Sequence, residues 1–350
     1  MIKMKDIKSL SKEELKEYIE SIGEKGFRAD QIFRWLHYDT VTSFDEMTNL
    51  SKALREKLKS EAYIADAKIH DCQISKTDGT RKYLFRFRDD CMAESVFMKY
   101  SYGNSVCISS QVGCRMGCSF CASTLDGLER NLTASEMLEQ IYAIKRDTGE
   151  DVSHIVVMGT GEPMDNYDNL LRFLKLINHP EGQNLGHRNI TVSTCGIVPK
   201  ILTLAEEKLQ ITLAISLHAP NQEKREKLMP VAKAYNINEL MDACRTYFDK
   251  TGRRISFEYS LIKGENDSED DAKELSELIR GINCHVNLIP VNPIKERTYR
   301  ESDKMGVLAF KNSLERNGIN VTIRREIGRD IDGACGQLRH RNLSDGRSEG

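Results

Sequence analysis

The sequence predicts an α/β protein built on a partial (β/α)6 barrel, preceded by a small helical region and a β-rich connection. Three observations support this fold class. From about residue 105 onward, apolar runs of strand length alternate with helical patterns, which is typical of βαβ units and a parallel sheet or barrel. Residues 10–62 show helical periodicity instead, and residues 66–109 show short β-like runs.

The N-terminal region is predicted to be helical. Ser11 stands three residues before Glu14, which is the spacing of a capping box at the start of a helix. Further helical patterns cover residues 29–37 and 50–60. We therefore assign residues 1–65 to a helical accessory domain.

The connection over residues 66–104 is predicted to be β-rich. Its clearest runs cover residues 83–87 and 95–100, and Asp78-Gly79 is a typical hairpin-turn dipeptide.

The barrel is predicted over residues 105–342. Thr133 and Glu136 form a second capping box, which opens a helix. Six βα units are too few to close an eight-stranded barrel, so we expect a partial one. One more strand is expected at 319–323, and the polar tail 343–350 is predicted to be disordered. The six expected barrel strands cover residues 106–109, 155–158, 190–192, 211–217, 255–261 and 286–290.

Composition is that of an ordinary soluble globular chain, with 39% hydrophobic and 30% charged residues. The first eight residues contain no apolar signal-peptide core, and no run approaches the ~18 apolar residues of a membrane span. We therefore expect a cytoplasmic protein without processing or a membrane partner. Nothing in the sequence suggests more than a monomer.

The net charge of −2 gives no support for a nucleic-acid partner, because proteins that bind nucleic acid are usually basic. Charge is nevertheless concentrated locally. The two basic groups are interpreted as solvated strand faces and a frayed tail. The alternative is that the arginines near 81–88, together with the helical N-terminal region, contact nucleic-acid phosphates. The groups are Arg81, Lys82, Arg86 and Arg88, and Arg324, Arg325, Arg329, Arg339 and Arg341.

Ten cysteines are many for a cytosolic chain, where clustered cysteines suggest metal binding or catalysis rather than disulfides. Five of them stand alone and are expected to be small buried hydrophobic residues. These five are Cys72, Cys91, Cys195, Cys244 and Cys284.

Cys114, Cys118 and Cys121 have the spacing C-x₃-C-x₂-C, directly after a predicted strand. Thiolates suit zinc or iron–sulfur, but a structural zinc site needs four ligands, and only three cysteines are local here. Three thiolates on a cubane cluster leave one iron open for a further ligand. A zinc knuckle completed by a distant residue is the alternative.

This spacing, with Phe120 before the last cysteine, resembles the radical S-adenosylmethionine superfamily. The resemblance implies a radical-SAM partial barrel and a 4Fe–4S cluster bound by Cys114, Cys118 and Cys121. It also implies that an electron from the cluster cleaves S-adenosylmethionine to a 5′-deoxyadenosyl radical.

Gly161 and Glu162 follow a predicted strand and are candidates for binding S-adenosylmethionine. Glycine lets backbone approach a ligand closely, and a glutamate could accept hydrogen bonds from the methionine ammonium. Other candidates lie at the ends of later strands and match binding positions of one family. They are Ser193, Ser216, Leu217, His218 and Asn292.

Cys335 lies after the last strand, in a segment rich in glycine and arginine. Positive neighbours lower the pKa of a thiol and make it nucleophilic. Cys107, seven residues before the cluster motif, is the second notable thiol. Spacing alone equally allows two inert cysteines.

Together these motifs resemble the RlmN/Cfr family of adenosine methyltransferases acting on RNA, and within it the RlmN branch. The resemblance runs from the helical N-terminal part to about Leu338. The matching segments are 106–114, 131–133, 161–163, 216–221, 228–230, 285–290 and 334–338.

The resemblance implies that a methyl group is placed on carbon 2 of adenosine in 23S rRNA and in tRNA. Cys335 would carry the methyl group, and two molecules of S-adenosylmethionine would be used per turnover. Cys107 would then attack the sulfur of Cys335, which releases the product as a disulfide forms. Either Glu94 or Cys107 would remove the ring proton, and a flavodoxin or ferredoxin would supply electrons.

Three rival functions remain at this point. A Cfr-type enzyme would methylate carbon 8 instead, and a glycyl-radical activase would have no use for Cys107 and Cys335. An electron-transfer protein would normally bind its cluster with four cysteines.

Overall fold

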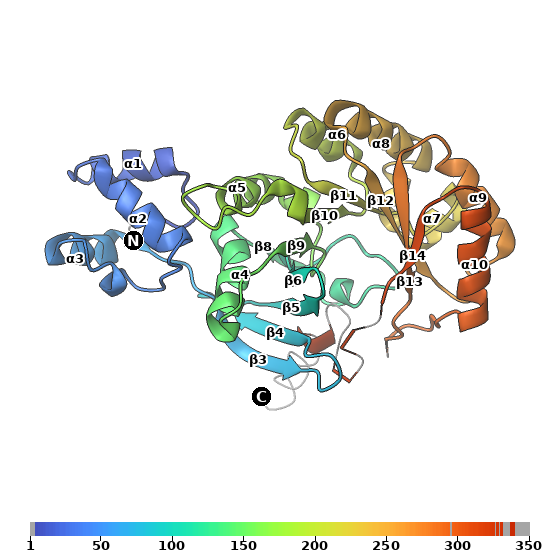
Figure 1. Ribbon diagram of the computed structural model, residues 1–350, viewed down its shortest axis with the longest axis horizontal. Helices are drawn as coiled ribbons and strands as arrows, with labels where there is room; N and C mark the ends of the chain where they lie inside the picture. Colours follow the sequence, from blue (N-terminus) through green and yellow to red (C-terminus); the bar gives the residue numbers. More distant parts are fainter. Residues whose placement is uncertain (1–3, 295, 326, 329, 332–336, 340–350) are drawn as a thin grey trace.

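The computed structural model describes residues 4–294, 296–325, 327–328, 330–331 and 337–339. In this part of the chain, one ten-stranded sheet has the order β14-β13-β12-β11-β10-β9-β6-β5-β4-β3 (Figure 1). Its strands are β3 (Lys68–Ile74), β4 (Arg81–Arg86), β5 (Met92–Tyr100), β6 (Gly103–Ile108), β9 (His154–Val157), β10 (Ile190–Thr194), β11 (Thr212–Ser216), β12 (Ile255–Leu261), β13 (Cys284–Pro290) and β14 (Val321–Ile323).

Within this sheet, β6 and the strands from β9 to β14 pair in parallel, which confirms the predicted partial barrel of βα units. The additional strand β14 joins the same sheet, in parallel with β13. Helices connect the strands and follow the curve of the sheet (Figure 1). They are α4 (Ala134–Thr148), α5 (Tyr167–Ile177), α6 (Val198–Glu206), α7 (Gln222–Leu228), α8 (Ile237–Thr251), α9 (Glu269–Leu278) and α10 (Lys304–Arg316).

The β-rich connection extends this sheet on its other side, because β3, β4 and β5 pair in antiparallel fashion and β5 pairs with β6. Asp78-Gly79 lies in the turn between β3 and β4, as predicted, and Gly79 has a φ of 73°. The interpretation of the nearby basic residues as a solvated strand face is wrong for Lys82, which is fully buried. Both faces of β4 are covered, so four successive residues of this strand are buried.

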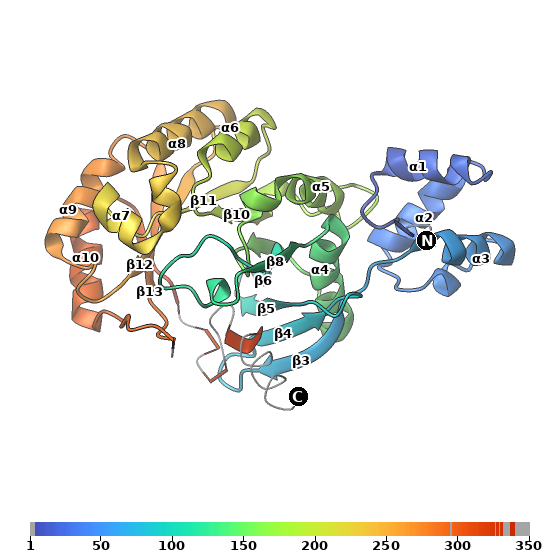
Figure 2. The same ribbon diagram turned by 180° about the vertical axis from the view of Figure 1, so that it is seen from behind.

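The N-terminal helices are α1 (Lys12–Ser21), α2 (Phe27–His37) and α3 (Lys52–Glu61), and they stand beside α4 and α5 (Figure 2). The predicted capping box at Ser11 and Glu14 is present. Helix α3 begins two residues later than predicted, because the side chain of Ser51 accepts a hydrogen bond from the Leu54 amide and caps it. No helix among the described residues has the length and apolar character needed to cross a membrane.

A buried ion pair joins the N-terminal region to the barrel. The ammonium of Lys8 contacts the carboxylate of Glu139 on α4, and both side chains are fully buried. Arg146 donates to the other oxygen of Glu139 at 2.7 Å, and Lys8 also donates to the carbonyl of Ala65 at 3.1 Å. Burial lowers the pKa of Lys8, and the neighbouring Glu139 carboxylate opposes this shift.

We expect Lys8→Met to destabilise the protein by about 3 kcal/mol, because breaking a buried pair leaves Glu139 with only one cationic partner. Urea denaturation of the apo-protein measures this loss. The matched control is Lys12→Met, which removes a partly exposed pair with Glu181 and should cost less than about 1 kcal/mol. Equal unfolding midpoints for the two variants would contradict the prediction.

Candidate active site

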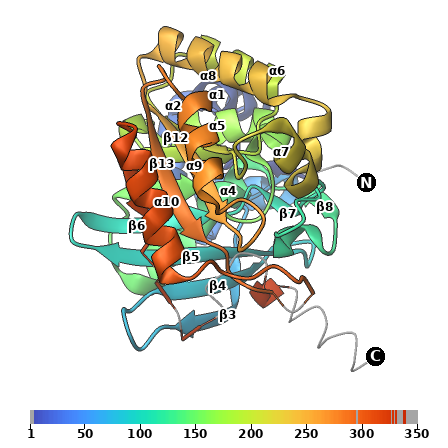
Figure 3. The same ribbon diagram turned by 90° about the vertical axis from the view of Figure 1, so that its right-hand side faces the viewer.

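The three motif cysteines lie in a loop framed by two short strands, β7 (Gln111–Gly113) and β8 (Leu128–Asn131), which pair with each other (Figure 3). Gly113 has a φ of 74°, and a Cβ there would lie 1.9 Å from the carbonyl oxygen of Gly127. Only glycine fits this position. The amide of Cys114 donates to the same carbonyl at 2.9 Å, which closes the base of the loop.

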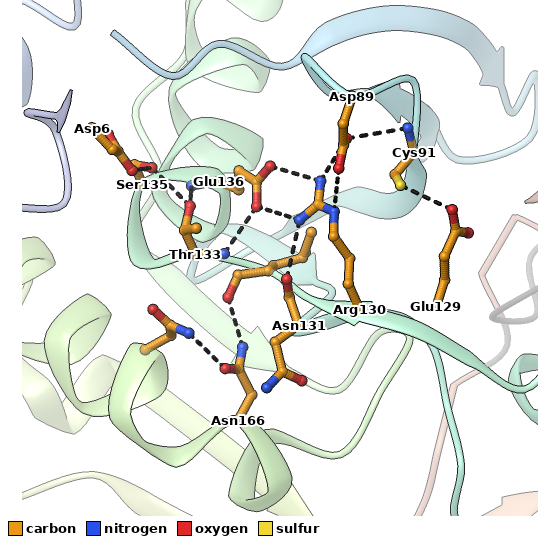
Figure 4. Close-up of polar contacts among 12 residues, drawn as sticks. Asp6, Asp89, Cys91, Glu129, Arg130, Asn131, Thr133, Ser135, Glu136 and Asn166 are labelled. Atoms are coloured by element: carbon orange, nitrogen blue, oxygen red, sulfur yellow. Dashed lines mark hydrogen bonds and ion pairs between the residues drawn. The ribbon is translucent and has the colours of Figure 1, made fainter. Parts of the chain in front are cut away.

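Arg130 of β8 anchors this loop to the rest of the protein (Figure 4). Its guanidinium contacts Asp89, which follows β4, at 2.5 Å and Glu136 of α4 at 2.8 Å. The neighbouring Glu129 accepts a hydrogen bond from the thiol of Cys91 at 3.0 Å. The loop is therefore held by both the β-rich connection and the first barrel helix.

Cys114, Cys118 and Cys121 line one cavity of about 170 Å³. Burial raises the pKa of Cys114 to about 12 and raises the pKa of Cys118 as well. Thiolates at this site therefore need a strong positive partner, and bound metal supplies one by deprotonating its thiol ligands. The cavity also receives several of the predicted S-adenosylmethionine residues, namely Gly161, Glu162, Ser193, Ser216 and His218.

This arrangement fits a cubane cluster. Among the residues that the structure describes, no three Cys, His, Asp or Glu side chains are grouped to hold a single metal ion. A cubane presents separate iron atoms at its corners, so its three thiolates need only surround a common cavity. The motif loop supplies three thiols and no carboxylate, and thiols are the soft donors that iron–sulfur clusters prefer.

Glu162 lies at the end of the turn that follows β9, with its side chain buried. Its two carboxylate oxygens accept hydrogen bonds from the amides of Met164 at 3.0 Å and Cys195 at 2.7 Å. Burial raises the pKa of this carboxyl group, while the hydrogen bonds oppose the shift. Gly161, with a φ of 102°, lies so close to Gln111 that a Cβ would approach its side chain to 2.5 Å.

Ser193 is the penultimate residue of β10 and Ser216 the last residue of the neighbouring β11, and their hydroxyl oxygens lie 3.3 Å apart. The next residue, Leu217, is fully buried and is not among the residues that line the cavity. His218 accepts a hydrogen bond on Nδ1 from the amide of Ser260 at 2.9 Å. Burial lowers the pKa of His218 to about 3, so the ring is neutral and carries its hydrogen on Nε2.

Asn292 and Cys107 line a second, larger cavity of about 400 Å³. The structure thus divides the predicted residues between two cavities, both at the carboxyl ends of the parallel strands. The exposed side chains of Arg324 and Arg325 border the second cavity. Lys82 lines it from the β-rich connection.

Glu94 is buried and pairs with Lys82, which lines this second cavity. Its carboxylate lies 3.0 Å from the ammonium of Lys82 and accepts a hydrogen bond from the amide of Arg339 at 2.6 Å. The interpretation of Arg339 as part of a frayed tail is wrong, because its side chain is buried and lies 3.0 Å from Glu129. Arg329 and Arg341 lie outside the described residues.

Cys335 also lies outside the described residues, as does the predicted tail 343–350. The described residues before it are tied to the turn between β3 and β4. Asp330 accepts hydrogen bonds from the hydroxyl of Ser75 at 2.6 Å and the amide of Lys76 at 2.8 Å. The amide of Gly328 donates to Asp78 at 2.9 Å.

Sequence patterns did not identify Lys82, Arg339 or Gln111 as parts of these sites. Lys82 belongs to a strand that is buried on both faces, so strand alternation gives no sign of its burial. Gln111 precedes the first motif cysteine, and its side chain accepts a hydrogen bond from the Glu162 amide at 2.8 Å. Of the lone cysteines, Cys195, Cys244 and Cys284 are buried as predicted, whereas Cys72 and Cys91 are only half-buried.

Comparison with known proteins agrees with this architecture. Residues 5–64 match the family described as the ribosomal RNA large subunit methyltransferase N-terminal domain, and residues 108–276 match the radical SAM superfamily. The crystal structure of a radical SAM methyltransferase from Sphaerobacter thermophilus is similar, with a TM-score of 0.91 and 43% sequence identity. That similarity covers 95% of this chain and 98% of the other.

Two relatives are similar over nearly their whole length. A probable dual-specificity RNA methyltransferase RlmN from Lachnospira eligens is 63% identical over 342 residues, which cover 98% of each chain. A protein of the same name from Lachnoclostridium phytofermentans is 61% identical over 334 residues, which cover 95% of this chain and 94% of the relative.

The partial barrel and its three-cysteine cavity define a radical S-adenosylmethionine enzyme. The chain is more than 60% identical to two RlmN proteins over nearly its full length, and this identity identifies the family within the class. The chain belongs to the RlmN family, which confirms both the resemblance and the fold class inferred from the sequence.

Proposed function

We propose that this protein methylates carbon 2 of adenosine in RNA, in 23S rRNA at the peptidyl transferase centre and in tRNA at the adenosine 3′ of the anticodon. The observation that carries the proposal is the presence of two cavities at the same edge of the sheet. One holds the cysteines of the cluster motif, and the other is lined by Cys107 and bordered by arginines. The names of the two relatives support RNA as the substrate.

Cys114, Cys118 and Cys121 would hold a 4Fe–4S cluster in the smaller cavity. The cluster, when bound, supplies the electron that cleaves S-adenosylmethionine. Glu162 and Gly161 would receive the methionine ammonium, and Ser193, Ser216 and the neutral His218 would provide further polar contacts, because all five residues line this cavity. Leu217 would contribute backbone only, because its side chain points into the core.

In this proposal Cys335 accepts a methyl group by displacement from one S-adenosylmethionine, and a second molecule is consumed to activate that methyl group. The 5′-deoxyadenosyl radical takes a hydrogen atom from this methyl group, and the resulting carbon radical bonds to carbon 2 of the adenine. The adduct then gives up the ring proton and one electron, and the bound cluster could accept that electron. Cys107 attacks the sulfur of Cys335, so that the product is released as the disulfide forms. Asn292 lines the same cavity as Cys107 and is a further candidate contact for S-adenosylmethionine.

Glu94 is the candidate acceptor for the ring proton, with Cys107 as the alternative. The buried ammonium of Lys82 and the amide of Arg339 contact the carboxylate of Glu94 from two directions. These contacts hold the Glu94 carboxylate in place next to the cavity lined by Lys82 and Cys107.

Nucleoside analysis of rRNA and tRNA tests the proposed function. Reconstituted enzyme is incubated with unmodified RNA, S-adenosylmethionine and a low-potential electron donor, and the digested RNA is analysed by mass spectrometry against isomer standards. We expect 2-methyladenosine from both RNAs. The carbon-8 isomer would assign Cfr-type chemistry instead, and the absence of any methylated adenosine would contradict the proposal.

RNA binding should depend strongly on salt, although the chain is slightly acidic overall. Phosphate contacts release counterions, so replacing both Arg324 and Arg325 by Gln should weaken binding and reduce the slope of log K against log salt by about 2. Fluorescence anisotropy with a tRNA stem-loop measures the slope. Arg188→Gln is the control, because this exposed residue precedes β10 at the opposite end of the strands. Equal slopes for the two variants would remove these arginines from the RNA interface.

We also propose that residues 1–65 form an accessory domain that adds RNA affinity, ahead of the connection 66–104 and the barrel 105–342. Deleting residues 1–60 is a poor test of this role, because it also removes Lys8 from the buried Glu139. Neutralising surface cations on the N-terminal helices leaves that pair intact.

We also propose that the protein is a cytoplasmic monomer and that it receives electrons from a flavodoxin or ferredoxin.

A further inference from the structure

Arg225 is a buried cation that the proposed reaction does not use. It lies on α7, and its side chain is fully buried. One of its terminal nitrogens donates to the carbonyl of Cys195 at 2.6 Å. Its Nε and its other terminal nitrogen have no hydrogen-bond partner among the described residues. Among the described residues, no carboxylate forms an ion pair with Arg225.

Arg225 lies directly behind the wall of the cavity that holds the motif cysteines. Cys195, whose carbonyl it binds, lines that cavity together with Cys118. Cys118, Cys195 and Leu228 pack in one buried cluster, and the amide of Ser119 donates to the carbonyl of Leu228 at 2.9 Å. Helix α7 therefore supports the cluster loop and brings its arginine close to a motif thiol.

A buried guanidinium without a counter-charge is unfavourable, because burial removes its hydration. The same burial lowers the pKa of Arg225, and the nearby Cys195 and Cys118 oppose the shift. A 4Fe–4S cluster bound by three thiolates is an anion, and it becomes more negative when it accepts an electron. Such a cluster is thus the counter-charge that Arg225 lacks in the protein alone.

We propose that Arg225 raises the reduction potential of the cluster by stabilising the added negative charge. Its charge acts across the turn at Cys195, the residue that follows β10 and separates Arg225 from the cavity. The electric field of the guanidinium acts through a layer of buried apolar residues, where charges interact strongly over several ångströms. Arg225 acts through the cluster and touches no substrate. This inference rests on the cluster-binding part of the proposed function and is independent of which RNA is methylated.

The test is an anaerobic redox titration of the reconstituted cluster, followed by electron paramagnetic resonance and carried out without RNA. Arg225→Met removes the charge and keeps apolar volume, and Arg225→Lys keeps the charge. We expect Arg225→Met to shift the reduction equilibrium at least tenfold toward the oxidised cluster, which is about 59 mV for one electron. Arg225→Lys should stay within about threefold of the wild type.

Lys227→Met is the matched control, because it removes a cation from the same helix at a side chain that is 62% exposed. Water screens that charge, so the potential should not change. A wild-type potential in Arg225→Met, or an equal shift in Lys227→Met, would overturn the inference.

Iron loading distinguishes a role in charge from a role in holding the turn. If Arg225→Met does not load iron but Arg225→Lys does, the charge is needed to bind the cluster, which supports the inference. If neither variant loads iron while both unfold at the wild-type urea midpoint, Arg225 only holds the Cys195 turn. A wild-type protein that takes up no iron would instead overturn the cluster assignment in the proposed function.

Discussion

The triple variant Cys114→Ala, Cys118→Ala, Cys121→Ala should retain essentially no cluster iron after anaerobic reconstitution and should form no methylated RNA. All three thiols line the same cavity, and alanine offers no ligand at any of these positions. Iron analysis and the visible absorption of the cluster measure the loss.

The matched control for this variant replaces three cysteines outside the motif, namely Cys72, Cys244 and Cys284. These side chains lie in or against the main hydrophobic core and do not line the cluster cavity. The control should bind as much iron as the wild type. Full iron loading of the motif variant would show that the cluster ligands lie elsewhere.

Replacing Cys335 and replacing Cys107 should stop methylation at different stages, because the two thiols act at different stages of the proposed reaction. Cys335→Ala should yield no methylated RNA, because no carbon can be carried to the substrate, yet it should still cleave some S-adenosylmethionine. Cys107→Ala should stall after the carbon–carbon bond has formed, with RNA covalently attached to Cys335. A denaturing gel should therefore show a protein–RNA band for Cys107→Ala and none for Cys335→Ala.

Cys91→Ala serves as the control for this pair, because Cys91 lies outside both cavities and its loss leaves both reactive thiols in place. It should methylate RNA and show no covalent band. Methylated RNA from Cys335→Ala, or an active Cys107→Ala without an adduct, would mean that another residue carries the methyl group.

Much of the fold followed from local patterns. The capping boxes at Ser11 and Thr133 open α1 and α4 as predicted, because a cap depends on residues only three positions apart. The barrel strands were visible as apolar runs, since parallel strands are buried on both faces. Helix α3 begins at Lys52, two residues after the predicted start, because the side chain of Ser51 caps it.

The candidate site was predicted only in part. The cysteine motif and the turn at Gly161 and Glu162 are each a short continuous stretch of sequence, so the residue spacing within each one predicts its chemistry. The division between two cavities, with Asn292 and Cys107 in the larger one, depends on how separate strand ends meet.

The sequence by itself determined the fold class, the cluster motif and the family, because these depend on residues near one another along the chain. Only the tertiary structure revealed that Lys82 is buried against Glu94, that Arg339 is bound to Glu129, and that Arg225 lies behind the cluster cavity. Each of these basic residues resembles a solvated charge in sequence. Burial is decided by which distant segments pack against a side chain, and residues far apart in the chain leave no local pattern that records the contact.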